Sequence, residues 1–262
     1  MKLHLESTRA SAARKFLTAF LAVQLIAINF SPAWAAGHDL PQPNDLDASK
    51  YSTSGNTMTI TPGGQGTINY DWFDIGHDFT VTFENAGEVT INKVNGGGQS
   101  EIFGNLNASG IIYLLNKSGV LFGDHAHVNV GGLVASTFMD ISKNADGQLE
   151  FTGDPGTGDI TVEGGATINA GAFAYLVGKN VNLAGAVNAG EVIVAAFGDK
   201  KDDYDAGSIV LRLGEDNPNT DGGDIAITNK FFTTNSVSEL NGDVTITNIV
   251  FYAEKEIGRA HV

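Results

Sequence analysis

The sequence predicts an all-β protein, folded as a right-handed parallel β-helix that an N-terminal β cap closes. Three observations predict this fold class: short segments in which apolar and polar residues alternate, motifs that return about every 20 residues, and no convincing apolar period of 3.6 residues after the N-terminal segment. Glycine supplies 33 of the 262 residues and proline only 6, which is typical of many short strands joined by tight turns.

Alternation marks several strands near the start of the fold. Three segments place apolar side chains on one face of a strand and threonines on the other, and their apolar residues are Met58/Ile60, Phe79/Val81/Phe83 and Val89/Ile91. Successive side chains of a strand point to opposite faces, so such strands are half buried. We therefore expect the apolar residues of each segment to face the core.

Two short motifs return at a spacing of 19 residues. Asn169-Ala-Gly171 returns as Asn188-Ala-Gly190, and Gly223-Asp-Ile-Ala-Ile227 returns as Gly242-Asp-Val-Thr-Ile246. An earlier copy of the second motif is Gly158-Asp-Ile-Thr-Val162, and a looser copy of the first begins at Asn107. In a parallel β-helix each strand pairs with its counterpart one coil away, at about 4.8 Å, and repeated asparagines can stack into hydrogen-bonded ladders. We expect such ladders here.

The repeats predict strands at residues 111–115, 128–130 and 192–196. One coil alone leaves its strand edges open, so several coils must stack before the fold is stable. The alternative is a β-sandwich with coincidental repeats. A sandwich depends on two-residue hairpin turns such as Asn-Gly, and Asn95-Gly96 and Asn241-Gly242 are too few to build one.

The first end of a solenoid is an exposed strand edge and needs a cap. We expect the cap near residues 51–92, which hold an aromatic group able to cover an apolar end, namely Tyr70, Trp72, Phe73, Phe79 and Phe83. The expected divisions are a cap with the first coils at 36–92 and further coils at 93–255. The polar, turn-rich stretches 199–205 and 215–224 predict loops that leave the coil.

Both ends of the chain have special sequences. Arg9, Arg14 and Lys15 precede the apolar residues 16–30, and Ala33-Trp34-Ala35 is a small-x-small cleavage site, so residues 1–35 are expected to form a signal peptide cut between Ala35 and Ala36. A buried N-terminal helix is the alternative. Residues 256–262, EIGRAHV, are what the first bases of a common sequencing adapter encode, so we expect the natural protein to continue beyond them.

Composition limits the partners of the chain. Residues 1–35 carry four basic residues and one acidic residue, a net charge of +3, so the −15 of the whole chain leaves −18 for the rest. Phosphate binding needs clustered Lys and Arg, so we expect no nucleic-acid partner. Cysteine is absent. That fits either a core that needs no disulfides or a chain that must stay unfolded while it threads a narrow pore.

The most informative stretch is residues 105–137, NLNASGIIYLLNKSGVLFGDHAHVNVGGLVAST. It contains short apolar strands, the turn Asn116-Lys-Ser-Gly119 and a Val-Gly-Gly-Leu-Val-Ala-Ser-Thr tail. This stretch closely resembles a segment shared by the N-terminal secretion domains of two-partner secretion exoproteins, the filamentous-haemagglutinin and haemolysin group. The segment Ile68-Asn-Tyr-Asp-Trp-Phe73-Asp-Ile-Gly76 is also similar to one of that family.

The family carries Asn-Pro-Asn-Gly where this chain has Asn116-Lys-Ser-Gly119. A type I turn favours Asn first, Pro second and Gly fourth, and this chain keeps both ends of that pattern but lacks the proline. The resemblance implies that a transporter reads this segment; the alternative is a role in coil geometry alone. The implied residues are Asn116, Lys117, Ser118, Gly119, Val120, Leu121, Phe122 and Gly123.

The resemblance implies export rather than catalysis. The chain would cross the inner membrane by the general secretion machinery and be bound in extended form by the periplasmic domains of a dedicated outer-membrane β-barrel transporter. It would then fold outside a Gram-negative cell, secreted or on the surface, and template downstream coils. The missing C-terminal part would serve adhesion, haemolysis or toxin delivery, with glycans as possible ligands. The alternatives are a β-helical polysaccharide-degrading enzyme and a stand-alone glycan-binding adhesin.

Neither a catalytic nor a cofactor site stands out. Asp124-His-Ala-His127 offers two imidazoles at i and i+2 but no evident third metal ligand. Asn217-Pro-Asn-Thr-Asp-Gly222 matches the first half of a calcium loop, but the twelfth position, where an EF-hand needs Glu, is Thr228. We expect no enzyme activity, no cofactor and no bound metal, and the calcium dependence of residues 217–224 stays open.

Overall fold

The chain from residue 37 onward is described by a computed structural model. The described residues are 37–145, 147, 149–153, 156–197, 211–212, 224–228, 231–241, 243–247 and 250–253, with side chains described within residues 37–197. All of them belong to one unit, Ala36–Val262. The expected signal peptide with its cleavage site at Ala35 and Ala36, and the C-terminal residues 256–262, lie outside the described residues.

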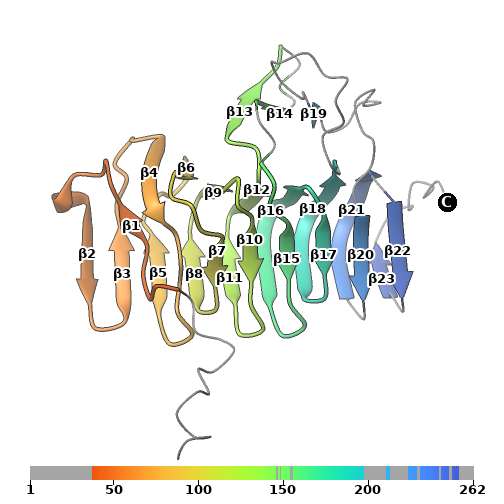
Figure 1. Cartoon of the computed structure of the whole chain (residues 1–262), viewed down its shortest axis with the longest axis horizontal. Coiled ribbons are helices and arrows are strands. Elements are labelled where there is room, and N and C mark those ends of the chain that lie inside the picture. The colour runs from red at the N-terminus through yellow and green to blue at the C-terminus, as the bar shows by residue number, and fades with distance from the viewer. Residues whose placement is uncertain are drawn as a thin grey trace, which may run out of the picture. The chain divides into compact units, whose positions relative to one another are not determined.

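The chain winds as a parallel β-helix whose coils have three faces, named A, B and C here (Figure 1). Face A contains β3 (Thr57–Ile60), β5 (Thr80–Phe83), β8 (Asn105–Ala108), β11 (His127–Val130), the first halves of β16 (Thr167–Gly178), β18 (Ala186–Ala196) and β21 (Phe231–Asn241), and β23 (Val250–Ala253). Face B contains β4 (Thr67–Trp72), β6 (Val89–Val94), β9 (Ile111–Leu115), β12 (Gly132–Ser136) and the second halves of β16, β18 and β21. Face C contains β7 (Ser100–Ile102), β10 (Val120–Phe122), β15 (Ile160–Val162), β17 (Val181–Leu183), β20 (Asp224–Thr228) and β22 (Asp243–Thr247).

Each coil passes through faces A, B and C in that order. Thus β5, β6 and β7 form one coil, and β8, β9 and β10 form the next. The strands along each face pair in parallel with the coils before and after. The parallel β-helix is therefore confirmed, and the β-sandwich alternative is wrong. The three strands predicted from the repeats are present as β9, as part of β11 and as the end of β18.

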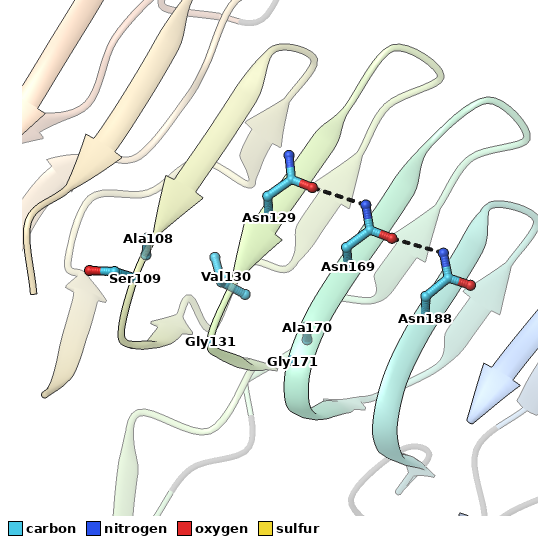
Figure 2. A pocket seen from close by; sticks show the side chains of 9 residues that line it. All are labelled: Ala108, Ser109, Asn129, Val130, Gly131, Asn169, Ala170, Gly171 and Asn188. Carbon is cyan, nitrogen blue, oxygen red and sulfur yellow. Dashed lines mark hydrogen bonds between the residues drawn. The ribbon is translucent and has the colours of Figure 1, made fainter. Parts of the chain in front are cut away.

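The 19-residue repeat corresponds to one coil. Asn169 pairs with Asn188, and Asp224 pairs with Asp243, in the registers that the motifs predict. The looser copy also aligns, because Asn107 pairs with Asn129 and Asn129 pairs with Asn169. Their side chains form the expected ladder: Asn169 Nδ2 donates to Asn129 Oδ1 and Asn188 Nδ2 donates to Asn169 Oδ1 (Figure 2).

The N-terminal end is covered by antiparallel elements. β1 (Gln42–Pro43) pairs antiparallel with β4, and β2 (Tyr51–Ser54) follows the short 3-10 helix η1 (Ala48–Lys50) and pairs antiparallel with β3. Beneath them the aromatic side chains of Tyr70, Phe73 and Phe83 are fully buried. Parallel pairing runs from β3 onward, so no break marks the expected division at residue 92, and that boundary stays a prediction.

The bore of the helix is filled by columns of apolar side chains that run along the axis. Face A contributes Met58, Val81, Leu106, Val128, Ile168 and Val187 in adjacent register. Face C contributes Ile102, Phe122, Val162 and Leu183. Because coils stack directly on one another, each apolar side chain is buried by its counterparts above and below, which is why one coil cannot be stable alone.

One strand faces the opposite way from the sequence prediction. In β6 the expected core residues Val89 and Ile91 point outward, and Val89 is 38% exposed. Thr90 and Asn92 point into the bore instead, with 1% and 0% of their surfaces exposed. In an alternating strand either set of side chains can face the core, and a shift of one residue exchanges the two sets. In β6 the polar set faces the core, so the sequence prediction for Val89 and Ile91 is wrong.

A three-stranded antiparallel sheet stands outside the coil. β13 (Asp140–Lys143) pairs with β14 (Leu149–Thr152), and β14 pairs with β19 (Leu211–Arg212). Phe138, Phe151 and Phe197 pack in a second apolar cluster against the outer side of face B. The predicted loop 199–205 and all of 215–224 except Asp224 lie outside the described residues. Within the described residues no helix is long and apolar enough to span a membrane.

Candidate functional site

The candidate segment, residues 116–123, begins at a wholly buried asparagine. Asn116 follows β9 directly, and its side chain is 0% exposed. Its Nδ2 donates to the Gly98 carbonyl at 2.9 Å and to Ser100 Oγ at 3.0 Å, both in the preceding coil. Its backbone N–H donates to the Ser136 carbonyl of the following coil at 2.9 Å. This one residue therefore ties three coils together.

Asn116 also closes a β-turn. The Gly119 N–H donates to the Asn116 carbonyl at 2.9 Å, and the Ser118 N–H donates to Asn116 Oδ1 at 2.9 Å. Gly119 has φ of 103°, and a Cβ there would lie 2.6 Å from the Asp159 carbonyl oxygen. The left-handed backbone and the close approach of the next coil both require glycine at this position.

The middle of the turn binds the next coil through its backbone. The Lys117 carbonyl accepts hydrogen bonds from Thr157 N–H at 3.0 Å and Gly158 N–H at 3.1 Å. The Lys117 side chain is exposed, and Ser118 is partly exposed. The turn is thus held from both sides along the axis, and Lys117 is its accessible side chain.

The rest of the segment is the face C strand β10 and its end. Val120 and Phe122 are fully buried in the bore, whereas Leu121 points outward and is half-buried. Gly123 is buried, and a Cβ there would lie 2.2 Å from the ring of Phe103. In the folded domain a partner would reach mainly Lys117, Ser118 and Leu121.

The histidines that follow do not share a strand face. His125 lies in the turn before β11, where its Nδ1 is 2.7 Å from Asp124 Oδ1 and its ring meets the His77 ring edge-on at 4.5 Å. His127 lies on β11, beside Asn105 and Thr167. Among the described residues no group of three or more His, Cys, Asp or Glu side chains is arranged to hold a metal. The candidate calcium loop, residues 217–224, lies outside the described residues apart from Asp224.

An open groove of about 550 Å³ runs beside the asparagine ladder at the corner of faces A and B (Figure 2). It is lined by Asn129, Asn169 and Asn188 and by small residues such as Gly131 and Gly171. Its lining contains no titratable side chain, so it offers no general acid or base.

Sequence reasoning found the turn but not its partners. Gly98, Ser100, Thr157 and Gly158 hold Asn116 and Lys117 in place. Of these four only Gly158 belongs to a repeated motif, and that motif does not connect it to Lys117. Ladder partners are 22, 40 and 19 residues apart in successive coils, so no constant offset connects a residue to its neighbour along the axis. Only the register of the folded chain brings these groups together.

Comparison with known proteins agrees with this architecture. Residues 38–251 match the model of the TPS secretion domain family. The chain is 37% identical over 175 residues to the heme/hemopexin-binding protein of Haemophilus influenzae strain Rd, a match that covers 61% of this chain and 18% of that protein. It is also 37% identical over 128 residues to another Haemophilus influenzae heme/hemopexin-binding protein, covering 46% of this chain and 14% of that one.

The fold is also similar to a solved structure. The crystal structure of the HMW1 secretion domain from Haemophilus influenzae aligns with a TM-score of 0.51 and 19% identity, over 74% of this chain and 55% of that one. At this identity the likeness concerns the fold alone, whereas the family match covers most of the sequence. The chain therefore belongs to the TPS secretion domain family, the secretion domains of two-partner secretion exoproteins, as the segment at residues 105–137 predicted.

Proposed function

We propose that this domain directs the protein that carries it through a dedicated outer-membrane β-barrel transporter, whose periplasmic domains bind the chain before it folds. The family match over residues 38–251 is the observation that carries this proposal. The signal-like sequence of residues 1–35, cut between Ala35 and Ala36, would bring the chain to the periplasm by the general secretion machinery. The product would be secreted or held at the surface of a Gram-negative cell.

Residues 116–123 are proposed as the segment that the transporter reads. In the folded domain Asn116, Gly119, Val120, Phe122 and Gly123 are buried. A partner that reads these side chains must meet them in the extended chain, before Asn116 bonds to Ser100 and before Thr157 bonds to the Lys117 carbonyl. Folding and recognition of this segment are therefore mutually exclusive, and coil closure would release the chain from the transporter.

Folding outside the cell would make export directional. The completed coils bury their apolar columns, and this removal of apolar surface from water makes return through the pore unfavourable. In a solenoid each folded coil offers its strand edges to the coil that follows it. The domain would thereby template the part of the exoprotein that follows.

The activity of the complete exoprotein lies beyond this domain. The chain spans less than a fifth of the two curated relatives it matches, so their heme/hemopexin-binding names describe proteins far longer than the matched region. Adhesion, haemolysis, toxin delivery and glycan binding are proposals for the downstream part. For the domain itself we propose no catalysis, because its relatives carry the names of secretion and binding proteins.

The test is export through the cognate transporter. Asn116→Ile removes the buried amide and Gly119→Val forces a β-branched side chain against the Asp159 carbonyl, so both are expected to lower the extracellular amount and leave signal cleavage intact. The wild-type domain should appear outside only when the transporter is present. Export of the wild type without it would overturn the proposed function.

A matched control separates recognition from folding. Ile160 is fully buried and pairs with Val120 from the next coil, but it lies outside the segment. Ile160→Ala should destabilise the fold by about 2–5 kcal/mol without altering the sequence that the transporter reads. Export of Ile160→Ala at wild-type levels, with loss for Asn116→Ile, supports recognition. Wild-type export of both segment variants contradicts it.

A further inference from the structure

The bore of the helix contains polar side chains in one coil of face B. At the position of Asn92 the next four coils carry Leu114, Ala135, Leu176 and Val194. At the position of Thr90 they carry Ile112, Leu133, Ala174 and Val192. Both polar residues belong to β6, one coil after β3 and β4, and both are buried as deeply as the aliphatic residues at these positions in later coils.

Asn92 is only partly satisfied in this position. Its Nδ2 donates to the Thr90 carbonyl at 3.3 Å and to the Tyr113 carbonyl at 3.2 Å, both longer than an optimal bond. Within the described part of the chain no donor reaches Asn92 Oδ1, which is buried. The amide lies between Ile68 of the preceding coil and Leu114 of the following one.

Thr90 belongs to a better satisfied group at the neighbouring corner. Asn85 Nδ2 donates to Thr90 Oγ1 at 3.0 Å, and the Gly110 N–H donates to Asn85 Oδ1 at 3.0 Å. These bonds give Asn85 and Thr90 a structural role in turning the chain. They give none to Asn92, whose buried carbonyl oxygen costs desolvation without a compensating protein donor.

Asn92 destabilises β6 by this desolvation cost, whereas the aligned positions of the neighbouring coils carry aliphatic residues without such a cost. β6 is also the strand whose orientation the sequence pattern predicted wrongly, and such local conflicts between pattern and fold tend to mark functional positions. The conflict stands near the N-terminal end of the stack, where a loss of stability in one coil also weakens the coils that pair directly with it.

We propose that Asn92 weakens and slows the folding of the N-terminal coils, so that the chain stays extended long enough to engage the transporter. This inference rests on the proposed function, because only a chain that must remain unfolded in the periplasm gains from such a residue. Asn92 thus slows folding, and it need not contact the transporter. A substitution that stabilises the folded domain therefore reduces its export.

The experiment replaces Asn92 with the residues of the later coils. Asn92→Leu continues the column of Leu114 and Leu176, and Asn92→Val has a smaller side chain in case leucine overfills the bore. Each chain is purified under denaturing conditions, refolded by dilution from urea and followed by Trp72 fluorescence and circular dichroism. At least one variant is expected to raise the folding equilibrium constant about tenfold and to refold faster than the wild type.

Export is then compared in cells that express the transporter. The stabilised variant is expected to show a several-fold smaller extracellular fraction and a larger protease-resistant periplasmic fraction. Asn107→Leu is the matched control: the same substitution on the outward side of β8 changes the hydropathy of the extended chain equally but fills no bore position. It also removes the acceptor of the long, exposed 3.4 Å ladder contact from Asn129, so its stability is measured alongside. It should be exported like the wild type.

Each outcome decides the inference. Slower export of a faster-folding Asn92 variant, with normal export of Asn107→Leu, supports it. The inference is wrong if both Asn92 variants are less stable than the wild type, or if a stabilised variant is exported at the wild-type level. That failure is distinct from a failure of the proposed function, which would appear as transporter-independent export of the wild type.

Discussion

Asn169 Nδ2 donates a hydrogen bond of 2.9 Å to Asn129 Oδ1, although 40 residues of chain separate them (Figure 2). Asn188 makes the same contact with Asn169 at 2.8 Å after only 19 residues. The longer coil contains the β13–β14 hairpin, which leaves the stack and returns the chain to the same register. A long insertion is tolerated because it lies outside the coil and the entropy of loop closure grows slowly with length.

The ladder predicts a directional effect of charge. Asn169→Asp keeps an acceptor for Asn188 but removes the donor to Asn129 Oδ1, so it should lower the free energy of unfolding at neutral pH by about 1 kcal/mol. The facing carbonyl oxygen should raise the folded-state pKa of the new carboxyl, so the loss should shrink as pH falls and the group is protonated. Urea unfolding at pH 7 and pH 4 measures both effects. Asn169→Thr, without charge, should show no such pH dependence, and an equal dependence in both would refute this explanation.

The turn at Lys117 predicts a stabilising substitution. Lys117 is the second residue of the β-turn closed by Asn116 and Gly119, a position that favours proline. A residue before proline prefers an extended backbone, and Asn116 directly follows the strand β9. Lys117→Pro should raise the free energy of unfolding by about 0.4–1 kcal/mol by restricting the unfolded chain. Lys117→Ala should have a smaller effect. A lower urea midpoint for the proline variant would show that the turn departs from the type I geometry.

The outer apolar cluster predicts local unfolding. Phe151 is fully buried and packs with Phe138, which in turn meets Phe197 edge-on at 4.9 Å. Phe151→Ala removes about 3–5 kcal/mol of local packing, which should free β13 and β14 while the coils stay intact. Hydrogen exchange should accelerate in residues 140–152 and remain slow in β9 and β12. Phe122→Ala, within the bore, should instead accelerate exchange across several coils.

Three tyrosines predict alkaline instability. Burial raises the pKa of Tyr70 well above its usual value, with the charge of Asp45 adding to the effect, and burial likewise raises the pKa values of Tyr113 and Tyr175. The folded state then holds protons that the unfolded state releases above about pH 10, so stability is full below that pH and falls as pH rises further. No protein donor or acceptor among the described residues pairs with the Tyr70 hydroxyl. Tyr70→Phe should therefore cost little at pH 7 and flatten the loss between pH 10 and 12 in thermal unfolding.

Metal removal is predicted to have no effect. His125 contacts Asp124 and His77, whereas His127 lies on β11. Chelation should therefore leave the thermal midpoint unchanged, and the purified domain should contain no stoichiometric zinc. The same measurement with added calcium tests residues 217–224. A shift in the midpoint on chelation, or a stoichiometric metal, would contradict this prediction.

The sequence predicted the repeating architecture because its signals are local. The Asn-Ala-Gly motifs at 169–171 and 188–190 recur at the length of one coil, and the strand at 111–115 has the bounds expected from its apolar run. Alternation also oriented Met58, Ile60, Val81 and Phe83 correctly, since all four are buried. Each of these inferences needs only neighbouring residues or a constant period.

The tertiary structure alone decided the contacts between coils. Asn92 and Thr90 lie inside, although the apolar residues Val89 and Ile91 were predicted to do so. Pairing with β9 fixes the register of β6, and in that register Val94 faces the bore together with the two polar residues. The tertiary structure also joined Asn116 to Ser100 and Lys117 to Thr157, across coils of unequal length. Local pattern thus determined that the chain would coil, through the period of its strands and turns. Which side chains meet along the axis depends on the summed length of every turn and insertion between them, and that is settled only when the coils stack.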